Sequence, residues 1–204
     1  MHGYTITAII KNIAGVSVRA QSAEGEVYEF LVTDESYKEL GFVEGDTVGE
    51  DDIASLTEEA DFCRAAARAV KILSYSSHSK MALVRKLCQY GFSKDTAVRA
   101  AENAEAKGQL DEIRQTEHLT DYYLRHKYWG KKRIAAELMS RGYSKNAVMN
   151  AISQVDESRF ECNLRHLVSK KPVPEDRHDR DKYISALVRM GYSLGEILGA
   201  IKEK

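Results

Sequence analysis

The chain has 204 residues, of which 43% are hydrophobic and 30% charged, and no apolar run approaches the ~18 residues of a membrane-spanning helix, so its composition predicts a soluble protein. The three cysteines form no CxxC pair, and no basic segment followed by an apolar one opens the sequence, so we expect a cytoplasmic protein with free thiols and no signal peptide. The net charge of −1 hides a division, because residues 1–62 carry 14 acidic and three basic groups whereas residues 63–204 carry 17 acidic and 27 basic groups. One end is therefore expected to repel polyanions and the other to attract them.

The first 50 residues alternate between apolar and polar side chains, as strands do. The candidate strands are Tyr4–Ile10, Gly15–Ala20 and Val27–Val32, and the polar residues 21–26 are expected to join the last two as a hairpin loop. A short helix is predicted to open near Thr33 and to end at Gly41, and residues 42–48 read as a turn. The sequence thus predicts a small β-rich module.

One phrase then occurs three times along the chain, each time with leucine, three intervening residues, glycine, an aromatic residue and serine. Its copies are Leu87–Ser93, Leu138–Ser144 and Leu187–Ser193, and their glycines lie 51 and 49 residues apart. Glycine can end a helix in the left-handed conformation, and serine is a preferred N-cap for the next helix. Each copy therefore predicts a helix, a tight corner and a second helix, and the spacing predicts a repeat of small helical units.

We therefore expect a mainly α, elongated fold in four parts. These are the β-rich module at residues 1–51, three-helix repeats at 52–108 and 109–169, and a divergent, shorter helical repeat at 170–204. The last boundary rests on the only two prolines of the chain, Pro172 and Pro174, which predict a loop.

The candidate binding site is a basic cluster in the second repeat. Its members are Arg125, Lys127, Lys131, Lys132, Arg133 and Arg141, and Lys80, Arg85 and Lys86 occupy the corresponding part of the first repeat. Cationic side chains at a helix start, beside aromatic residues, can hold phosphates, stack on bases or meet an acidic protein surface. The competing interpretation, a solvated helix face without a ligand, stays open. We expect Trp129, inside the cluster, to pack between helices rather than to stack on a ligand.

Catalytic signals are missing from the sequence. There is no GxSxG motif, and Gly130-Lys131-Lys132 lacks the glycine spacing and the Ser/Thr of a phosphate-binding loop. His178 and Asp179 lie close together, but no second ligand pair accompanies them. We therefore predict no catalytic residues, no metal site, no cofactor and no enzymatic activity.

Four segments of the chain resemble the RecX family of recombination regulators. They are Leu73–Lys80 before the second helix of the first repeat, the corner Leu83–Phe92, the junction Gly108-Gln109-Leu110-Asp111-Glu112, and Trp129–Leu138 in the second repeat. The resemblance covers nearly the whole chain, and it implies an N-terminal β-containing segment followed by three tandem three-helix repeats.

The resemblance also implies a function. Members of this family are non-enzymatic regulators that bind the RecA–single-stranded DNA filament and modulate, in our expectation inhibit, its assembly, ATPase and strand exchange in DNA repair and the SOS response. The partners implied are the RecA filament and single-stranded DNA, with duplex DNA bound weakly, and we expect a monomer without membrane contact. Two alternatives remain at this point: a DNA-binding regulator whose corners act as helix-turn-helix units, and a scaffold that binds no nucleic acid.

Overall fold

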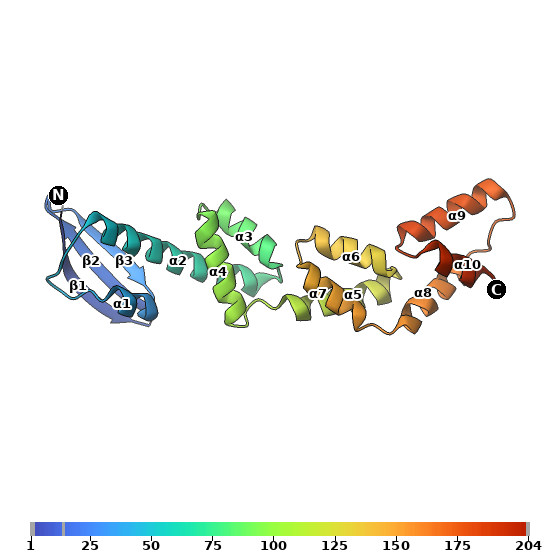
Figure 1. Ribbon diagram of the computed structural model, residues 1–204, viewed down its shortest axis with the longest axis horizontal. Helices are drawn as coiled ribbons and strands as arrows, with labels where there is room; N and C mark the ends of the chain where they lie inside the picture. Colours follow the sequence, from blue (N-terminus) through green and yellow to red (C-terminus); the bar gives the residue numbers. More distant parts are fainter. Residues whose placement is uncertain (1–2, 14, 203–204) are drawn as a thin grey trace. The chain divides into compact units, whose positions relative to one another are not determined.

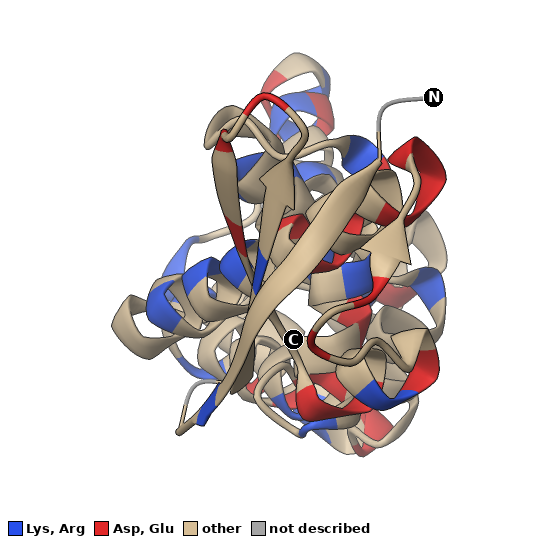
Figure 2. Ribbon diagram, turned by 90° about the vertical axis from the view of Figure 1, so that its left-hand side faces the viewer, with Lys and Arg blue, Asp and Glu red and all other residues tan. Residues whose placement is uncertain are grey.

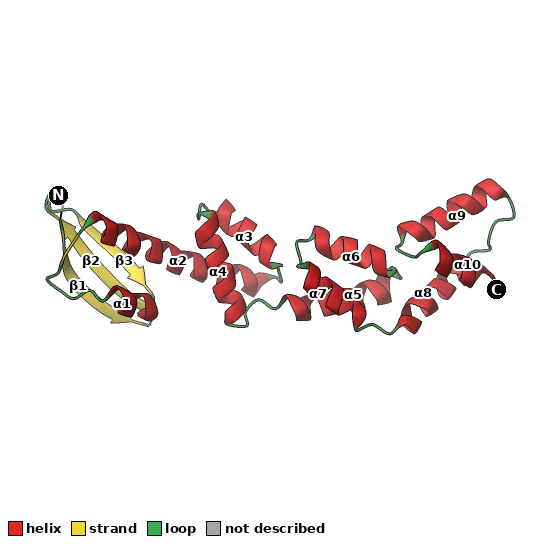
Figure 3. Ribbon diagram, in the orientation of Figure 1, coloured by secondary structure: helices red, strands yellow, loops and turns green. Residues whose placement is uncertain are grey.

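The computed structural model describes residues 3–13 and 15–202. Met1 and His2, which belong to the segment used to predict that there is no signal peptide, lie outside the described residues. The described chain is mainly helical after a small N-terminal strand module, which confirms the predicted fold class (Figures 1 and 3). The strands are β1 (Tyr4–Asn12), β2 (Gly15–Ser22), β3 (Val27–Val32) and β4 (Thr47–Val48). The helices are α1 (Asp34–Leu40), α2 (Glu50–Tyr75), α3 (Lys80–Gln89), α4 (Lys94–Ala106), α5 (Glu112–Lys127), α6 (Lys131–Ser140), α7 (Lys145–Ser153), α8 (Glu157–Lys170), α9 (Arg177–Arg189) and α10 (Leu194–Lys202).

The strands form one antiparallel sheet in the order β3-β2-β1-β4. Alternation places Val16, Val18 and Ala20 of β2 in the core, where they are fully buried. The fourth strand was not predicted, since residues 42–48 read as a turn: β4 is only two residues long and pairs with Tyr4 and Thr5 at the start of β1. A strand this short carries no periodic signal, so its pairing depends on the rest of the sheet.

The helix α2 serves two hydrophobic cores. Leu56 in its first half packs with the sheet residues, whereas Ala65, Ala69 and Ile72 in its second half pack with α3 and α4. Its 26 residues carry an apolar stripe from end to end, so it buries one face against two different neighbours. The β-rich module and the first repeat are consequently joined by one continuous helix, and both belong to one compact unit.

The repeated phrase forms the predicted corner in all three copies. Gly91, Gly142 and Gly191 adopt φ angles of +93°, +85° and +99°. In the first copy, the amide of Phe92 donates to the carbonyl of Leu87, the leucine of the phrase, and the other copies have the equivalent bond. This is the Schellman ending of a helix, in which the residue after glycine bonds and packs back onto the last turn. The aromatic residue and the leucine of the phrase are therefore one packed pair.

The serines of the phrase cap the following helices, as predicted. The hydroxyl oxygens of Ser93, Ser144 and Ser193 accept from backbone amides three residues later. Each capping bond satisfies an amide at the start of a helix that has no partner within the helix. Two consecutive helices thus meet at a defined angle in every repeat.

The helix α8 differs from the expectation that the second repeat extends to residue 169. Phe160 in its first turn packs in the core of the second repeat, but Leu164 and Val168 pack with Leu187 of α9 and Ile197 of α10. The amphipathic face of α8 runs on past the closed second core, and its remaining apolar residues need another partner. We therefore propose that the third repeat comprises α8, α9 and α10, and is not shorter than the other two.

The described chain divides into two compact units. The first contains the chain up to His78 together with Leu83–Leu110, and the second contains Ser79–Ala82 together with the chain from Asp111 onward. Within the first unit, acidic residues are frequent in the sheet module, which faces the viewer in Figure 2 with its Asp and Glu positions in red.

Candidate functional site

The predicted basic residues of the second repeat lie on three neighbouring segments. Arg125 and Lys127 are in the last turn of α5, Lys131, Lys132 and Arg133 form the first turn of α6, and Arg141 is the C-cap of α6. Apart from Lys131, which is half-buried, all are exposed. The break at residues 128–130 brings the first two segments together.

Three of these cations are already paired with carboxylates. Arg125 bonds to Asp121 at 2.7 Å, Arg141 bonds to Glu137 at 2.9 Å, and Lys131 bonds to Glu157 of α8. Burial alone would raise the pKa of Asp121, but hydrogen bonds from Arg159 and Arg125 outweigh it and hold that pKa below its ordinary value. The charge of these three cations is largely compensated, so they attract a polyanion less than their number suggests.

The other three cations of the cluster have no acidic partner within the described residues. They are Lys127, Lys132 and Arg133. The Arg133 guanidinium lies over the Trp129 ring, 4.9 Å from its centroid. Uncompensated, exposed cations are the groups that a phosphate backbone would neutralise. We therefore propose that, within the second repeat, these three residues are the ones that a polyanion would contact.

At the starts of α6 and α3, several backbone amides already have partners. At α6, the amide of Gly130 donates to the carbonyl of Met190, and the amide of Lys132 donates to the carbonyl of Gly191. At α3, the amide of Lys80 donates to the buried carboxylate of Glu112. Helix starts bind anions through unpaired amides, and here the next repeat or a carboxylate already occupies these amides. These three amides are therefore not available to a phosphate, and the side chains at the two helix starts are its more accessible partners.

These bonds form a junction that occurs twice. The Ser79 hydroxyl donates to the carbonyl of Arg141, the residue that precedes the corner glycine Gly142. In the same way, the Gly130 amide donates to the carbonyl of Met190, the residue that precedes the corner glycine Gly191. A Cβ at Gly130 would lie 2.6 Å from the Gly191 carbonyl group, so the two backbones are in direct contact. The junction fixes α6 against the third repeat and thereby sets the position of Lys132 and Arg133.

The two aromatic residues inside the cluster are both engaged in packing. Trp129 stacks on Tyr123 with ring centroids 4.7 Å apart, as expected for a residue packed between helices. The Tyr128 ring contacts both His166 and Lys170 of α8, and the backbone carbonyl of Tyr128 accepts a hydrogen bond of 2.9 Å from the Tyr192 hydroxyl. Neither ring is a free stacking surface.

Sequence reasoning overlooked an aromatic pair on the exposed face of α5. The side chain of Tyr122 is 47% exposed, and its ring centroid lies 4.7 Å from that of His126, one turn later. Both rings precede the uncompensated Lys127 on the chain. The signal available in the sequence was the i, i+4 spacing of two planar side chains beside a cation.

The corresponding cations of the first repeat lie along α3. Arg85 and Lys86 are exposed, and the Lys86 ammonium contacts the His78 ring nitrogen at 3.1 Å. Partial burial and the charge of Lys86 lower the pKa of His78, so this imidazole tends to stay neutral. Lys80 is half-buried at the helix start, where Glu112 holds its amide.

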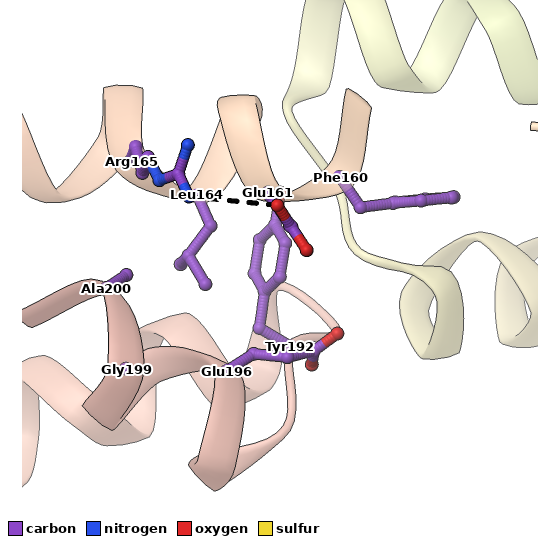
Figure 4. A pocket seen from close by; sticks show the side chains of 8 residues that line it. All are labelled: Phe160, Glu161, Leu164, Arg165, Tyr192, Glu196, Gly199 and Ala200. Atoms are coloured by element: carbon purple, nitrogen blue, oxygen red, sulfur yellow. Dashed lines mark ion pairs between the residues drawn. The ribbon is translucent and has the colours of Figure 1, made fainter. Parts of the chain in front are cut away.

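The pocket between α8 and α10 is small for a substrate site. The pocket in Figure 4 lies between α8 and α10, has a volume of about 200 Å³, and is lined by Tyr192, Leu164 and the ion-paired Glu161 and Arg165, among others. This volume is below the ~300 Å³ at which small-molecule sites usually begin. Within residues 3–13 and 15–202, we find no group of three metal-ligating side chains and no helix long and apolar enough to cross a membrane.

Comparison with known proteins adds the following findings. No protein-family model matches the chain. Proteins named regulatory protein RecX are 22% identical over 158 residues in Clostridium perfringens and 28% identical over 143 residues in Herminiimonas arsenicoxydans. These alignments cover 78% and 68% of this chain, and 74% and 91% of the relatives.

Solved structures give the same answer for the fold. A crystal structure of a regulatory protein RecX matches with a TM-score of 0.75 over 98% of this chain and 100% of its own, at 15% identity. The crystal structure of RecX from Lactobacillus salivarius matches with a TM-score of 0.62 over 70% of this chain and 96% of its own, at 17% identity. Together, the sequence and structure matches support a RecX family assignment. The chain therefore has the fold of these RecX crystal structures.

Proposed function

We propose that this protein regulates the RecA recombinase by binding the RecA–single-stranded DNA filament, and that binding inhibits filament assembly, ATPase and strand exchange. The observation that carries the proposal is the similarity to regulatory RecX proteins, which extends over nearly the whole chain in the structural comparison. The uncompensated cations Lys127, Lys132 and Arg133 support it, because they provide side chains for a polyanionic partner.

The protein acts, in this proposal, without chemistry of its own. Its relatives are named regulatory proteins, and a helical repeat is more often a binding surface than an enzyme. We propose that it works as a monomer in the cytoplasm, within DNA repair and the SOS response. The free thiols of Cys63, Cys88 and Cys162 are compatible with a reducing compartment.

The alternative, a helix-turn-helix regulator that reads duplex DNA, is less well supported. In such a protein the helix after the corner presents its first residues to the DNA. Here the amide of Ser144, before α7, donates to the carboxylate of Glu112, and the amide of Ser193, before α10, donates to Glu196. Carboxylates at these helix starts would repel the phosphates of the duplex.

A charge-reversal experiment tests the proposal. The double variant Lys132→Glu, Arg133→Glu should bind RecA filaments on single-stranded DNA at least about tenfold more weakly than the unmodified protein, with a weaker dependence of affinity on salt. Affinity for the filament is measured at several salt concentrations by fluorescence anisotropy of labelled protein.

The matched control is Arg189→Glu, Lys202→Glu, which changes the net charge by the same amount on exposed positions of α9 and α10. We expect it to weaken binding much less. Equal losses in both variants would show that attraction depends on overall charge and would refute the assignment of the site. Absence of filament binding by the unmodified protein would refute the proposed function itself.

A further inference from the structure

We infer that the exposed face of α5 is a stacking platform for unpaired bases, formed by His118, Tyr122 and His126. This inference rests on the proposed function, since it names the part of a single strand that one face of the protein contacts. The cations considered so far are suited mainly to the phosphates of a nucleic acid, so the platform adds a contact to the bases.

The spacing of the three residues places their rings in one row. His118, Tyr122 and His126 are four residues apart on one helix, so they lie on the same face, one turn above another. All three side chains are exposed. Tyr122 and His126 already contact each other with their rings tilted by 46°.

The Tyr122 ring packs against the Tyr123 ring and is still partly exposed to solvent. Its ring meets the edge of the buried Tyr123 ring, at a centroid distance of 5.7 Å and an angle of 69°. Tyr123 in turn stacks on Trp129. The exposed Tyr122 ring therefore packs against a buried pair of aromatic rings. Because this contact already restricts the Tyr122 side chain, its loss of conformational entropy on binding a ligand should be small.

The charges around the platform suit a single strand. Lys127 follows the last ring directly and has no acidic partner within the described residues. Of the two acidic residues on the same stretch of α5, Asp121 is neutralised by Arg125 and Arg159, and Glu117 remains exposed. A strand stacked on the rings would thus find an available cation, Lys127, at the C-terminal end of α5.

Base stacking has a chemical signature that separates it from phosphate binding. Stacking on an aromatic ring is tolerant of sequence and requires only that the bases be present and unpaired. An oligothymidylate and an abasic oligomer of equal length carry the same phosphates but differ in this single property. The ratio of their affinities therefore measures contact with bases.

The experiment measures the affinity of the full chain for these two oligomers by fluorescence anisotropy. We expect the unmodified protein to prefer the oligothymidylate by about tenfold, and Tyr122→Ala to reduce this preference by about fivefold or more. Tyr122→Phe should retain the preference, because the stacking ring remains. Circular dichroism and the fluorescence of Trp129, the single tryptophan of the chain, verify that each variant is folded.

The variant Lys132→Glu, Arg133→Glu is the second control, since it should weaken the binding of both oligomers and leave their ratio unchanged. The stacking platform is refuted if the unmodified protein shows no preference, if it binds neither oligomer, or if Tyr122→Ala leaves the ratio unaltered. The filament assay distinguishes failure of the stacking platform from failure of the proposed function. Filament binding by the unmodified protein without a preference for the oligothymidylate refutes only the platform, whereas absence of filament binding by the unmodified protein refutes the proposed function.

Discussion

At the scale of single residues, glycine is required in the repeats for two different reasons: a left-handed backbone conformation and the close approach of another backbone segment. Gly191 needs a left-handed backbone and also touches another segment, since a Cβ there would lie 2.4 Å from the amide nitrogen of Arg133. Gly130 has an ordinary φ of −79°, so only the close approach of the Gly191 backbone requires glycine there. The residue type is the same, but the physical reason for it differs between the two positions.

This difference predicts the effect of adding one methyl group. Gly130→Ala should destabilise the second unit by about 2–3 kcal/mol, because the new Cβ collides with backbone atoms that cannot rotate away. Gly199→Ala, in the middle of α10 with open space around it, should instead stabilise by about 0.5–1 kcal/mol. Urea unfolding followed by Trp129 fluorescence compares the two, and equal effects would show that the junction contact does not matter.

At the scale of elements, one carboxylate connects the sheet module to two helices of the first repeat. Glu59 of α2 accepts hydrogen bonds from Ser36 of α1 and from the guanidinium of Arg99 in α4. The Arg99 guanidinium also lies over the Phe62 ring, 4.1 Å from its centroid. Partial burial would raise the pKa of Glu59, but the bonds from Arg99 and Ser36 outweigh it and lower that pKa.

The sign of this shift predicts a dependence of stability on pH. A carboxyl group whose pKa is lower in the folded state stabilises the fold above its ordinary pKa of about 4.3, and this contribution disappears as the pH falls through the lower folded value. Glu59→Gln should therefore cost about 1 kcal/mol near neutral pH and lose its effect in acid, a modest value because Arg99 is partly exposed.

Thermal unfolding over a pH series measures this difference. Glu58→Gln, which alters an exposed neighbour on the same helix, should leave the stability unchanged. A constant difference between the Glu59 variant and the unmodified protein at all pH values would mean that the ionised carboxylate does not connect the elements.

At the scale of the whole molecule, the charge division of the sequence falls mainly on different structural parts. The acidic residues concentrate on the sheet module and the start of α2, whereas the uncompensated cations of the candidate site belong to the second unit. Tandem repeats provide several separate surfaces, and weak contacts on one chain add through effective concentration. We therefore propose that the protein occupies several RecA protomers at once and does not compete for ATP.

The prediction concerns the RecA ATPase on single-stranded DNA, titrated with this protein at low and high ATP concentration. Inhibition should be equally potent at both concentrations, because the sequence has no phosphate-binding loop and the proposed contacts do not involve the ATP site of RecA. A fragment of residues 1–110, which lacks the second unit's cations, should lose most of its potency. Relief of inhibition by ATP, or full potency of the fragment, would contradict multiple occupation.

The features that were predictable from the sequence are those whose cause lies within a few residues. The corners at Gly91, Gly142 and Gly191 are predictable because a left-handed glycine and a following serine cap act over a single turn. The alternating strands and the ends of α1 are local in the same sense. For this reason the mainly helical fold class could be derived before any coordinates.

The features that only the tertiary structure decided depend on residues far apart in the chain. Lys131 is paired with Glu157 and Lys132 is not, although the two are adjacent in the sequence. The helix start that looked suitable for phosphate is occupied by the corner of the next repeat, through the carbonyls of Met190 and Gly191. Which cations are paired with carboxylates, and which backbone amides are hydrogen-bonded, depends on the tertiary contacts between distant segments. Neither the composition nor a local sequence pattern contains information about these contacts.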